Sequence, residues 1–128
     1  MIVGIGTDLV EVERIRQSLG RHKGKIAARI LATAELELFQ QRGERMRAHF
    51  LAKRFAAKEA LVKALGTGFR EGIQMRDIEV GHTPQGKPEF CLRGGALTQY
   101  ERLGVTSSHL SISDEVSYAV AFVILESN

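Results

Sequence analysis

The sequence predicts an α+β protein in which a mostly antiparallel sheet packs on one long central helix. Residues 50–65 contain no proline, are rich in Ala, Leu, Lys, Arg and Glu, and stop at Gly66, a pattern typical of a helix with a glycine end. Residues 108–113 alternate strictly between polar and apolar side chains, and residues 117–125 are almost continuously apolar. Because only a short turn separates these two segments, they predict a pair of antiparallel strands.

Residues 1–8 (MIVGIGTD) alternate as a strand does, and two glycines share one side of the strand with Asp8. We expect a helix to begin near Leu9, which gives Asp8 two interpretations. With Glu11 three residues later, it has the spacing of a capping box, and Asp is a favoured N-cap. As a carboxylate at a strand end with bare neighbours, it is also a candidate site residue.

Short helices are expected before the central one. Residues 14–29 predict one or two basic helices that are broken around Gly20 and Gly24. Thr33 is a good N-cap for the next helix, which carries Glu35 in its first turn.

The central helix is expected to start near Arg45. At 100° per residue, one apolar stripe of this helix must face the core, and its members are Leu51, Phe55, Val62 and Leu65. Lys58 projects near the middle of this stripe. At such a position a lysine either extends its ammonium group to the surface or meets a buried partner.

The C-terminal half combines short strands with one helix. The expected elements are a loop over 69–74, a strand over 76–80, a turn-rich connection over 81–88, a strand over 89–92 and a helix over 94–103. In the alternating segment after them, His109, Ser111 and Ser113 face one side. Residues 114–115 predict a tight turn, and the apolar segment that follows suits the middle of a sheet.

Composition indicates one soluble domain over residues 1–128. The chain is 44% apolar and 26% charged, and no apolar run approaches the ~20 residues that a membrane span needs. The chain does not open with a basic segment and a long apolar region, so we expect no signal peptide, a cytoplasmic location and no membrane partner. Cys91 is the only cysteine, which excludes an internal disulfide and a cysteine metal cluster.

Lysine and arginine outnumber the acidic residues by 18 to 15, which gives a net charge of +3. The cations gather in two clusters: Arg14, Arg16, Arg21, Lys23, Lys25 and Arg29 in the first, and Arg42, Arg45, Arg47, Lys53, Arg54 and Lys58 in the second. Such clusters attract a nucleic acid, a phosphorylated cofactor or an acidic protein, or they are solvated helix faces. No aromatic residue interleaves with the first cluster, which gives base stacking little support.

Glu59 and Lys63 stand one helical turn apart, on a side that they share with Ala52 and Ala56. They form either an ordinary ion pair on a solvated face, worth ~0.3–0.5 kcal/mol, or part of a site where something bulky approaches the helix. Magnesium is usually held by one or two carboxylates together with substrate phosphates and water. If the first strand meets the central helix, Asp8 and Glu59 could be these carboxylates.

Other residues could complete a phosphate site around such a metal ion. Lys63 would offset the charge on a phosphate leaving group. His109 and Ser111 could form hydrogen bonds with other phosphate oxygens.

At these residues the chain resembles the holo-acyl-carrier-protein synthase family of 4′-phosphopantetheinyl transferases. The matching pieces occur in family order over essentially the whole chain: GIGTDLVE over 4–11, FLAKRFAAKEA over 50–60, KALGTG over 63–68 and HLSIS over 109–113. Their combination is far more specific than any single piece. Many members carry a His directly after the last piece, whereas this chain has Asp114, so no role of that His is carried over.

The resemblance implies the 4′-phosphopantetheinyl transferase fold and transfer of the phosphopantetheine arm of coenzyme A to a serine of apo acyl carrier protein, in support of fatty acid biosynthesis. The second product would be 3′,5′-ADP. Asp8 and Glu59 match the family's Mg²⁺ ligands, and Lys63 matches a lysine that stabilises or protonates the leaving group. The serine would lose its proton to Glu59 or to a metal-bound water. The implied coenzyme A site contains Lys63, Gly66, Pro88, His109 and Ser111.

Acyl carrier proteins are strongly acidic, and members of the family present arginines of the first helix to them. Arg14 and Arg21 are therefore the expected carrier contacts, with Arg29 and Arg45 as further candidates. The resemblance also implies a homotrimer with active sites between subunits, and no nucleic acid partner. The rival hypothesis is a non-catalytic basic module that binds nucleic acid or an acidic protein. That module would show salt-sensitive binding without any need for coenzyme A.

Overall fold

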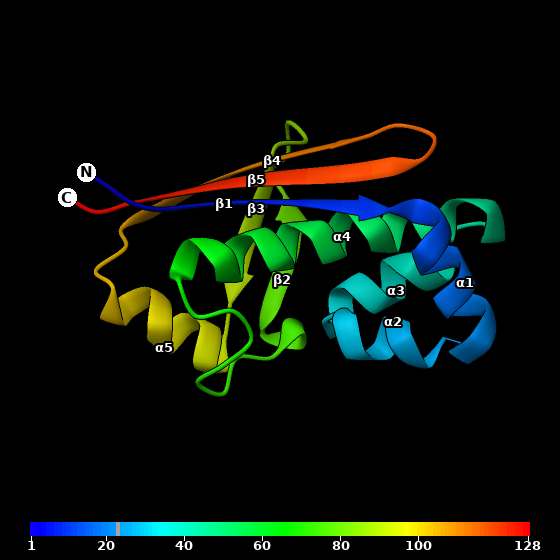
Figure 1. Ribbon diagram of the computed structural model, residues 1–128, viewed down its shortest axis with the longest axis horizontal. Helices are drawn as coiled ribbons and strands as arrows, with labels where there is room; N and C mark the ends of the chain where they lie inside the picture. Colours follow the sequence, from blue (N-terminus) through cyan, green and yellow to red (C-terminus); the bar gives the residue numbers. More distant parts are fainter. Residues whose placement is uncertain (23) are drawn as a thin grey trace.

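The computed structural model describes residues 1–22 and 24–128. In chain order, its elements are β1 (Ile2–Glu11), α1 (Val12–His22), α2 (Lys25–Ile30), α3 (Thr33–Gln41), α4 (Glu44–Leu65), a 3₁₀ turn η1 (Met75–Asp77), β2 (Ile78–His82), β3 (Pro88–Leu92), α5 (Gly94–Arg102), β4 (Ser107–Asp114) and β5 (Tyr118–Glu126). The α4 helix runs beneath the sheet, with α1, α2 and α3 grouped at one end and α5 at the other (Figure 1). Among the described helices, none combines the length and the apolar character that crossing a membrane requires.

Every strand pair in the described part of the chain is antiparallel, which confirms the predicted α+β class. β5 lies between β1 and β4 in a three-stranded sheet, and β2 and β3 form a separate two-stranded ladder. The segment predicted for the middle of a sheet is therefore β5. Its side chains alternate between the buried inner face and an exposed outer face, and the outer ones include Tyr118, Val120 and Phe122.

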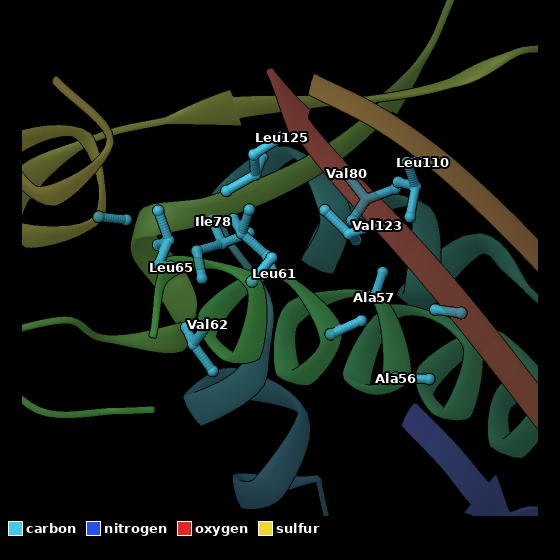
Figure 2. Close-up of a cluster of buried hydrophobic side chains, with 14 of the residues drawn as sticks. Ala56, Ala57, Leu61, Val62, Leu65, Ile78, Val80, Leu110, Val123 and Leu125 are labelled. Atoms are coloured by element: carbon cyan, nitrogen blue, oxygen red, sulfur yellow. The ribbon is translucent and has the colours of Figure 1, made fainter. Parts of the chain in front are cut away.

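The α4 helix is buried on more than the predicted stripe. Figure 2 shows its side chains packed with those of β2, β4 and β5. Ala52 and Ala56 are fully buried as well, so the expectation that their side of the helix is open to a bulky ligand is wrong. Ala52 packs in a cluster with Val12 and Ala119. Further along the helix, the bare backbone at Gly4 and Gly6 lets β1 lie directly against the carbonyl groups of Ala64 and Ala60.

The first strand continues beyond its predicted end, so Asp8 does not cap a helix. Asp8 lies in the ladder opposite Ala121 of β5, and α1 begins only at Val12. Pairing with β5 overrides the local capping pattern because each further residue of β1 adds to the hydrogen-bonded ladder. Asp8 therefore shares the inner face of β1 with Gly6, towards α4.

Three other predicted boundaries shift. α1 runs through Gly20, and the break falls at Gly24, which has a left-handed φ of 86°. Thr33 is the first residue of α3 and not its N-cap, and the side chain of Glu35 accepts the N–H of the residue before Thr33. The strand predicted over 76–80 starts later, because η1 occupies the first part of that segment.

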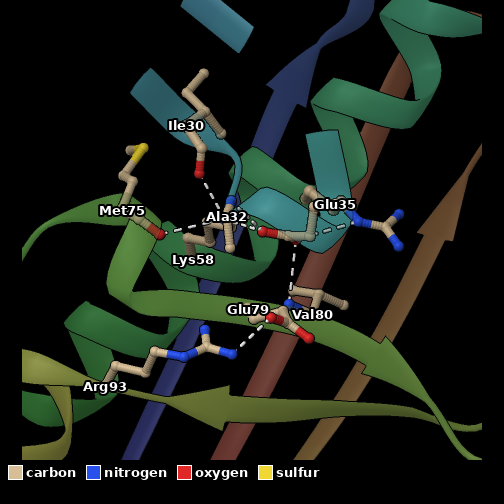
Figure 3. Close-up of polar contacts among 9 residues, drawn as sticks. Ile30, Ala32, Glu35, Lys58, Met75, Glu79, Val80 and Arg93 are labelled. Carbon is tan, nitrogen blue, oxygen red and sulfur yellow. Dashed lines mark hydrogen bonds and ion pairs between the residues drawn. The ribbon is translucent and has the colours of Figure 1, made fainter. Parts of the chain in front are cut away.

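Lys58 meets a buried partner, the second of its two predicted alternatives. Its side chain is fully buried, and its Nζ lies 2.6 Å from Oε1 of Glu35 (Figure 3). The same Nζ donates to the carbonyl groups of Ile30 and Met75. Burial lowers the pKa of Lys58, and the Glu35 carboxylate opposes that shift. These contacts fasten α2, α3 and η1 to the central helix.

Candidate active site

The inner face of β1 meets the last turns of α4 at the predicted acids and lysine. Nζ of Lys63 lies 3.1 Å from Oδ1 of Asp8 and donates to the carbonyl of Thr7, also at 3.1 Å. Glu59 precedes Lys63 by one turn of α4. The side chain of Asp8 is 16% exposed and that of Lys63 is 52% exposed, so Lys63 reaches the carboxylate from the solvent side. The strand and the helix therefore meet, as the magnesium hypothesis requires.

A cavity of about 380 Å³ opens beside Asp8 and Glu59. Its other walls include Arg14 and Ile15 of α1, Ile26 of α2 and Phe55 of α4. Burial raises the pKa of the Glu59 carboxyl, the charge of Asp8 raises it further, and Lys63 opposes both effects. Asp8 thus lies close enough to disfavour the charge of Glu59, a repulsion that a bound cation would relieve.

The donors around this cavity fit a magnesium ion. Carboxylate oxygens are hard ligands, and the cavity presents the carboxylates of Asp8 on β1 and Glu59 on α4, with Glu11 as a third at the exposed end of β1. Over residues 1–22 and 24–128, no three His, Cys, Asp or Glu side chains gather as a metal cage. Magnesium normally completes its octahedron with substrate phosphates and water, so two protein carboxylates suit it.

His109 and Ser111 lie on the other side of the sheet. Both are exposed on the outer face of β4, whereas Asp8 faces inward to α4. Nε2 of His109 lies 2.5 Å from Oε1 of Glu126 on β5. A single copy of the chain therefore does not bring His109 and Ser111 to the carboxylates.

Pro88 lines a second cavity, of about 510 Å³, at the β4 edge of the sheet, which is the edge opposite β1. Its walls carry Phe50, one acid, Asp114, and five basic side chains, namely Arg42, His49, Lys53, Arg54 and His82. Burial lowers the pKa of His82, and the charges of Arg54 and Lys53 lower it further. The cavity is therefore suited to an anionic ligand. Gly66 lies away from it, at the C-terminal end of α4 beyond Lys63, with a left-handed φ of 81°.

The predicted carrier contacts lie on three helices, α1, α2 and α4. Arg14 lines the cavity beside the two carboxylates, Arg21 is exposed in the last turn of the same helix, and Arg29 is exposed on α2. Arg45 instead lines a wide cavity beside the turn between β4 and β5. Lys23 of the first basic cluster lies outside the described residues.

Sequence reasoning missed Glu35 and misread Arg54. Glu35 is 1% exposed and Arg54 is 5% exposed, so Arg54, like Lys58, does not belong to a solvated face. The guanidinium carbon of Arg54 lies 4.0 Å from the centroid of the Phe50 ring. The sequence contained a signal for a buried acid, because Arg54 and Lys58 stand one turn apart beside the apolar stripe. Two cations buried there need a negatively charged partner.

Residues 4–123 match the family model of the 4′-phosphopantetheinyl transferase superfamily. The chain belongs to this superfamily. The match confirms the resemblance inferred from the motifs, and it spans β1, α4 and the strand that carries His109.

Full-length relatives agree with the superfamily match. The holo-(acyl-carrier-protein) synthase of Hydrogenovibrio crunogenus is 53% identical over 127 residues, which cover 99% of this chain and 98% of that protein. The crystal structure of the synthase from Neisseria meningitidis has 46% identity and a TM-score of 0.89, and the match covers 98% of this chain and 99% of that one. The synthase from Bacillus anthracis, solved in complex with coenzyme A (3′,5′-ADP), has 38% identity and a TM-score of 0.82, over 100% and 99% of the two chains.

Proposed function

We propose that this chain is a magnesium-dependent holo-acyl-carrier-protein synthase. It transfers the 4′-phosphopantetheine group of coenzyme A to a serine hydroxyl of apo acyl carrier protein and releases 3′,5′-ADP. It serves fatty acid biosynthesis in the cytoplasm, with residues 1–128 acting as one domain. The observation that carries the proposal is the convergence of Asp8 with Glu59 and Lys63 in a chain of this superfamily.

The residues around the carboxylates have distinct tasks in this reaction. Asp8 and Glu59 would hold the magnesium ion, which would offset charge on the coenzyme A pyrophosphate and polarise the attacked phosphorus. The serine oxygen bonds to the phosphorus that carries the pantetheine arm while the pyrophosphate P–O bond breaks, and the serine proton passes to Glu59 or to water. Lys63 is half exposed, so its ammonium can turn from Asp8 to the leaving phosphate and offset its charge.

The residues proposed to bind coenzyme A lie in two separate places on one copy of the chain. Lys63 and Gly66 belong to the half of the site near β1, whereas Pro88, His109 and Ser111 belong to the half near β4. The basic cavity near Pro88 suits the nucleotide end of coenzyme A. This division supports an active site that is shared between two copies.

The outer face of the sheet supports a homotrimer. It exposes large apolar side chains of two strands, namely Val3, Ile5 and Leu9 of β1 and Tyr118, Val120 and Phe122 of β5. Contact between the sheets of neighbouring copies would remove this surface from water and bring the half-site of one copy to the half-site of another.

Phe122→Asp is expected to separate the trimer into monomers and to abolish transfer, because an unpaired charge in an apolar interface costs several kcal/mol. Light scattering would measure the mass in solution. Leu103→Asp is the matched control, since Leu103 is 37% exposed beyond α5 and Phe122 is 44% exposed on the proposed interface. A trimeric Phe122→Asp protein, or a monomeric wild type, would contradict the proposed assembly.

Arg14→Glu is expected to raise the KM for the acidic carrier about 10-fold and to flatten its salt dependence, with coenzyme A affinity unchanged. Arg21→Glu should act in the same direction. Steady-state kinetics at several salt concentrations would measure both. Arg102→Glu is the control with the same net charge, because Arg102 is exposed at the end of α5. Wild-type carrier kinetics in both variants would contradict a docking surface on α1.

The proposed reaction is tested by measuring 3′,5′-ADP with chromatography after incubation with coenzyme A, Mg²⁺ and apo carrier. We expect 3′,5′-ADP only when the carrier is present. Release without the carrier would indicate hydrolysis of coenzyme A. No release with the carrier would favour the non-catalytic basic module.

A further inference from the structure

Arg54 is a buried cation at the wall of the cavity that contains Pro88. Its side chain is 7% exposed and lies over the Phe50 ring. Its Nε lies 3.2 Å from Oε2 of Glu35, close enough for an ion pair but not aligned for a hydrogen bond. This Nε is a buried donor with no hydrogen-bond acceptor among the described residues. A guanidinium with unused donors at a cavity wall indicates a ligand that accepts hydrogen bonds there.

Glu35 is the group that holds Arg54 in this position. Each carboxylate oxygen of Glu35 contacts one backbone N–H and one cation. Oε1 accepts from the N–H of Ala32 at 2.9 Å and from Lys58 at 2.6 Å, whereas Oε2 accepts from the N–H of Val80 at 3.1 Å (Figure 3). Oε2 also faces Arg54. The carboxylate is thus fixed by the residue before α3, by α4 and by β2, and Arg54 has a rigid counter-ion.

We propose that Glu35 is a positioning residue for coenzyme A, which acts by holding the Arg54 guanidinium against Phe50 with its outer N–H groups directed to the ligand. The assignment rests on the proposed function, which makes that ligand the nucleotide end of coenzyme A. Glu35 itself does not line the cavity.

Glu35 is the counter-ion that keeps the buried charge of Arg54 at the cavity wall. Burial lowers the pKa of Arg54, and Glu35 is the main group that opposes the shift. Without the carboxylate, the guanidinium would be a buried charge with no counter-ion, and it would leave the wall for water. The contact with Val80 also fastens β2, whose hairpin carries His82 and Pro88 of the same cavity. A ligand then binds to donors that are already ordered, which reduces the entropy cost of binding.

A double-mutant cycle on coenzyme A binding tests the proposal. The dissociation constant of coenzyme A is measured by titration calorimetry for the wild type, Glu35→Gln, Arg54→Met and the double variant. We expect about 10-fold weaker binding in each single variant. The double variant should bind no worse than Arg54→Met, because Glu35 acts through Arg54. The kcat at saturating coenzyme A should change less than the KM.

Lys58→Met is the matched control for a general structural effect. It removes the cation on Oε1 and leaves the Oε2 contacts in place. We expect it to lower the melting temperature but to change coenzyme A affinity less than two-fold. If Glu35→Gln does not fold, Glu35→Asp is the variant to measure. It keeps the negative charge, but its shorter side chain places the carboxylate farther from Arg54. It should weaken binding in the wild-type background and have no effect beside Arg54→Met.

The possible outcomes separate this proposal from the proposed function. A wild-type chain that binds no coenzyme A would overturn the proposed function and the role of Glu35 together. Wild-type binding with an unchanged Glu35→Gln variant would overturn only the role of Glu35. Additive losses in the double variant, or an equal loss in Lys58→Met, would also overturn it.

Discussion

Glu59→Gln is expected to lower the rate of phosphopantetheine transfer by about 10³-fold and to leave the fold intact. The amide keeps the shape of the side chain but removes one of the negative charges that line the cavity. Stability should not fall, because burial and Asp8 already disfavour the ionised form of Glu59. Transfer rates at saturating coenzyme A and over a range of Mg²⁺ concentrations would measure the effect.

Glu11→Gln is the matched control for Glu59→Gln. Glu11 lines the same cavity but is exposed at the end of β1, and it has no assigned contact with the metal ion. Its substitution also removes one negative charge and should change the rate less than three-fold, a limit that corresponds to roughly 0.7 kcal/mol. Equal losses in the two variants would mean that only the charge of the cavity matters. A wild-type rate in Glu59→Gln would contradict the assignment of Glu59 as a metal ligand.

Gly6→Ala is expected to lower the free energy of unfolding by about 3 kcal/mol or more. A Cβ atom on Gly6 would lie 1.9 Å from the carbonyl oxygen of Ala60 and 2.9 Å from the backbone N of Ala64. These are backbone atoms of α4 and cannot rotate away, so β1 must lift from the helix. Asp8 would then move away from Glu59 and Lys63, and transfer should fall together with stability. Denaturant unfolding would measure the change.

Gly20→Ala is the control for Gly6→Ala. A Cβ atom on Gly20 meets no atom within 4 Å, and Gly20 lies inside α1. Alanine should therefore stabilise the helix by about 0.5–1 kcal/mol. If Gly6→Ala were as stable as the wild type, the close approach of β1 to α4 would be wrong.

Local patterns predicted the elements well but not their partners. Alternation correctly assigned His109 and Ser111 to one face of β4, and the glycine end of α4 was found at Gly66. The sequence could not show that Asp8 lies inside a ladder, because its partner Ala121 is distant in the chain and a capping pattern competes locally. Pairing between distant segments decides such cases.

The buried charges show the same limit. Lys58 was correctly identified as unusual, but its partner Glu35 lies 23 residues away on another helix. From the sequence, Glu35 was interpreted only as an acidic residue in the first turn of that helix. The alanine side of α4 was expected to be open, since small side chains leave room. The glycines of β1 use that room, a fit that appears only when the two elements are packed together.

The most direct test of the proposed reaction is mass spectrometry of apo acyl carrier protein after incubation with this protein, coenzyme A and Mg²⁺. We expect the carrier to gain the mass of one phosphopantetheine group, and we expect EDTA to prevent the gain. No gain on any of several carriers, with the protein folded and Mg²⁺ present, would contradict the proposed transfer. The basic-module hypothesis would then become the leading one.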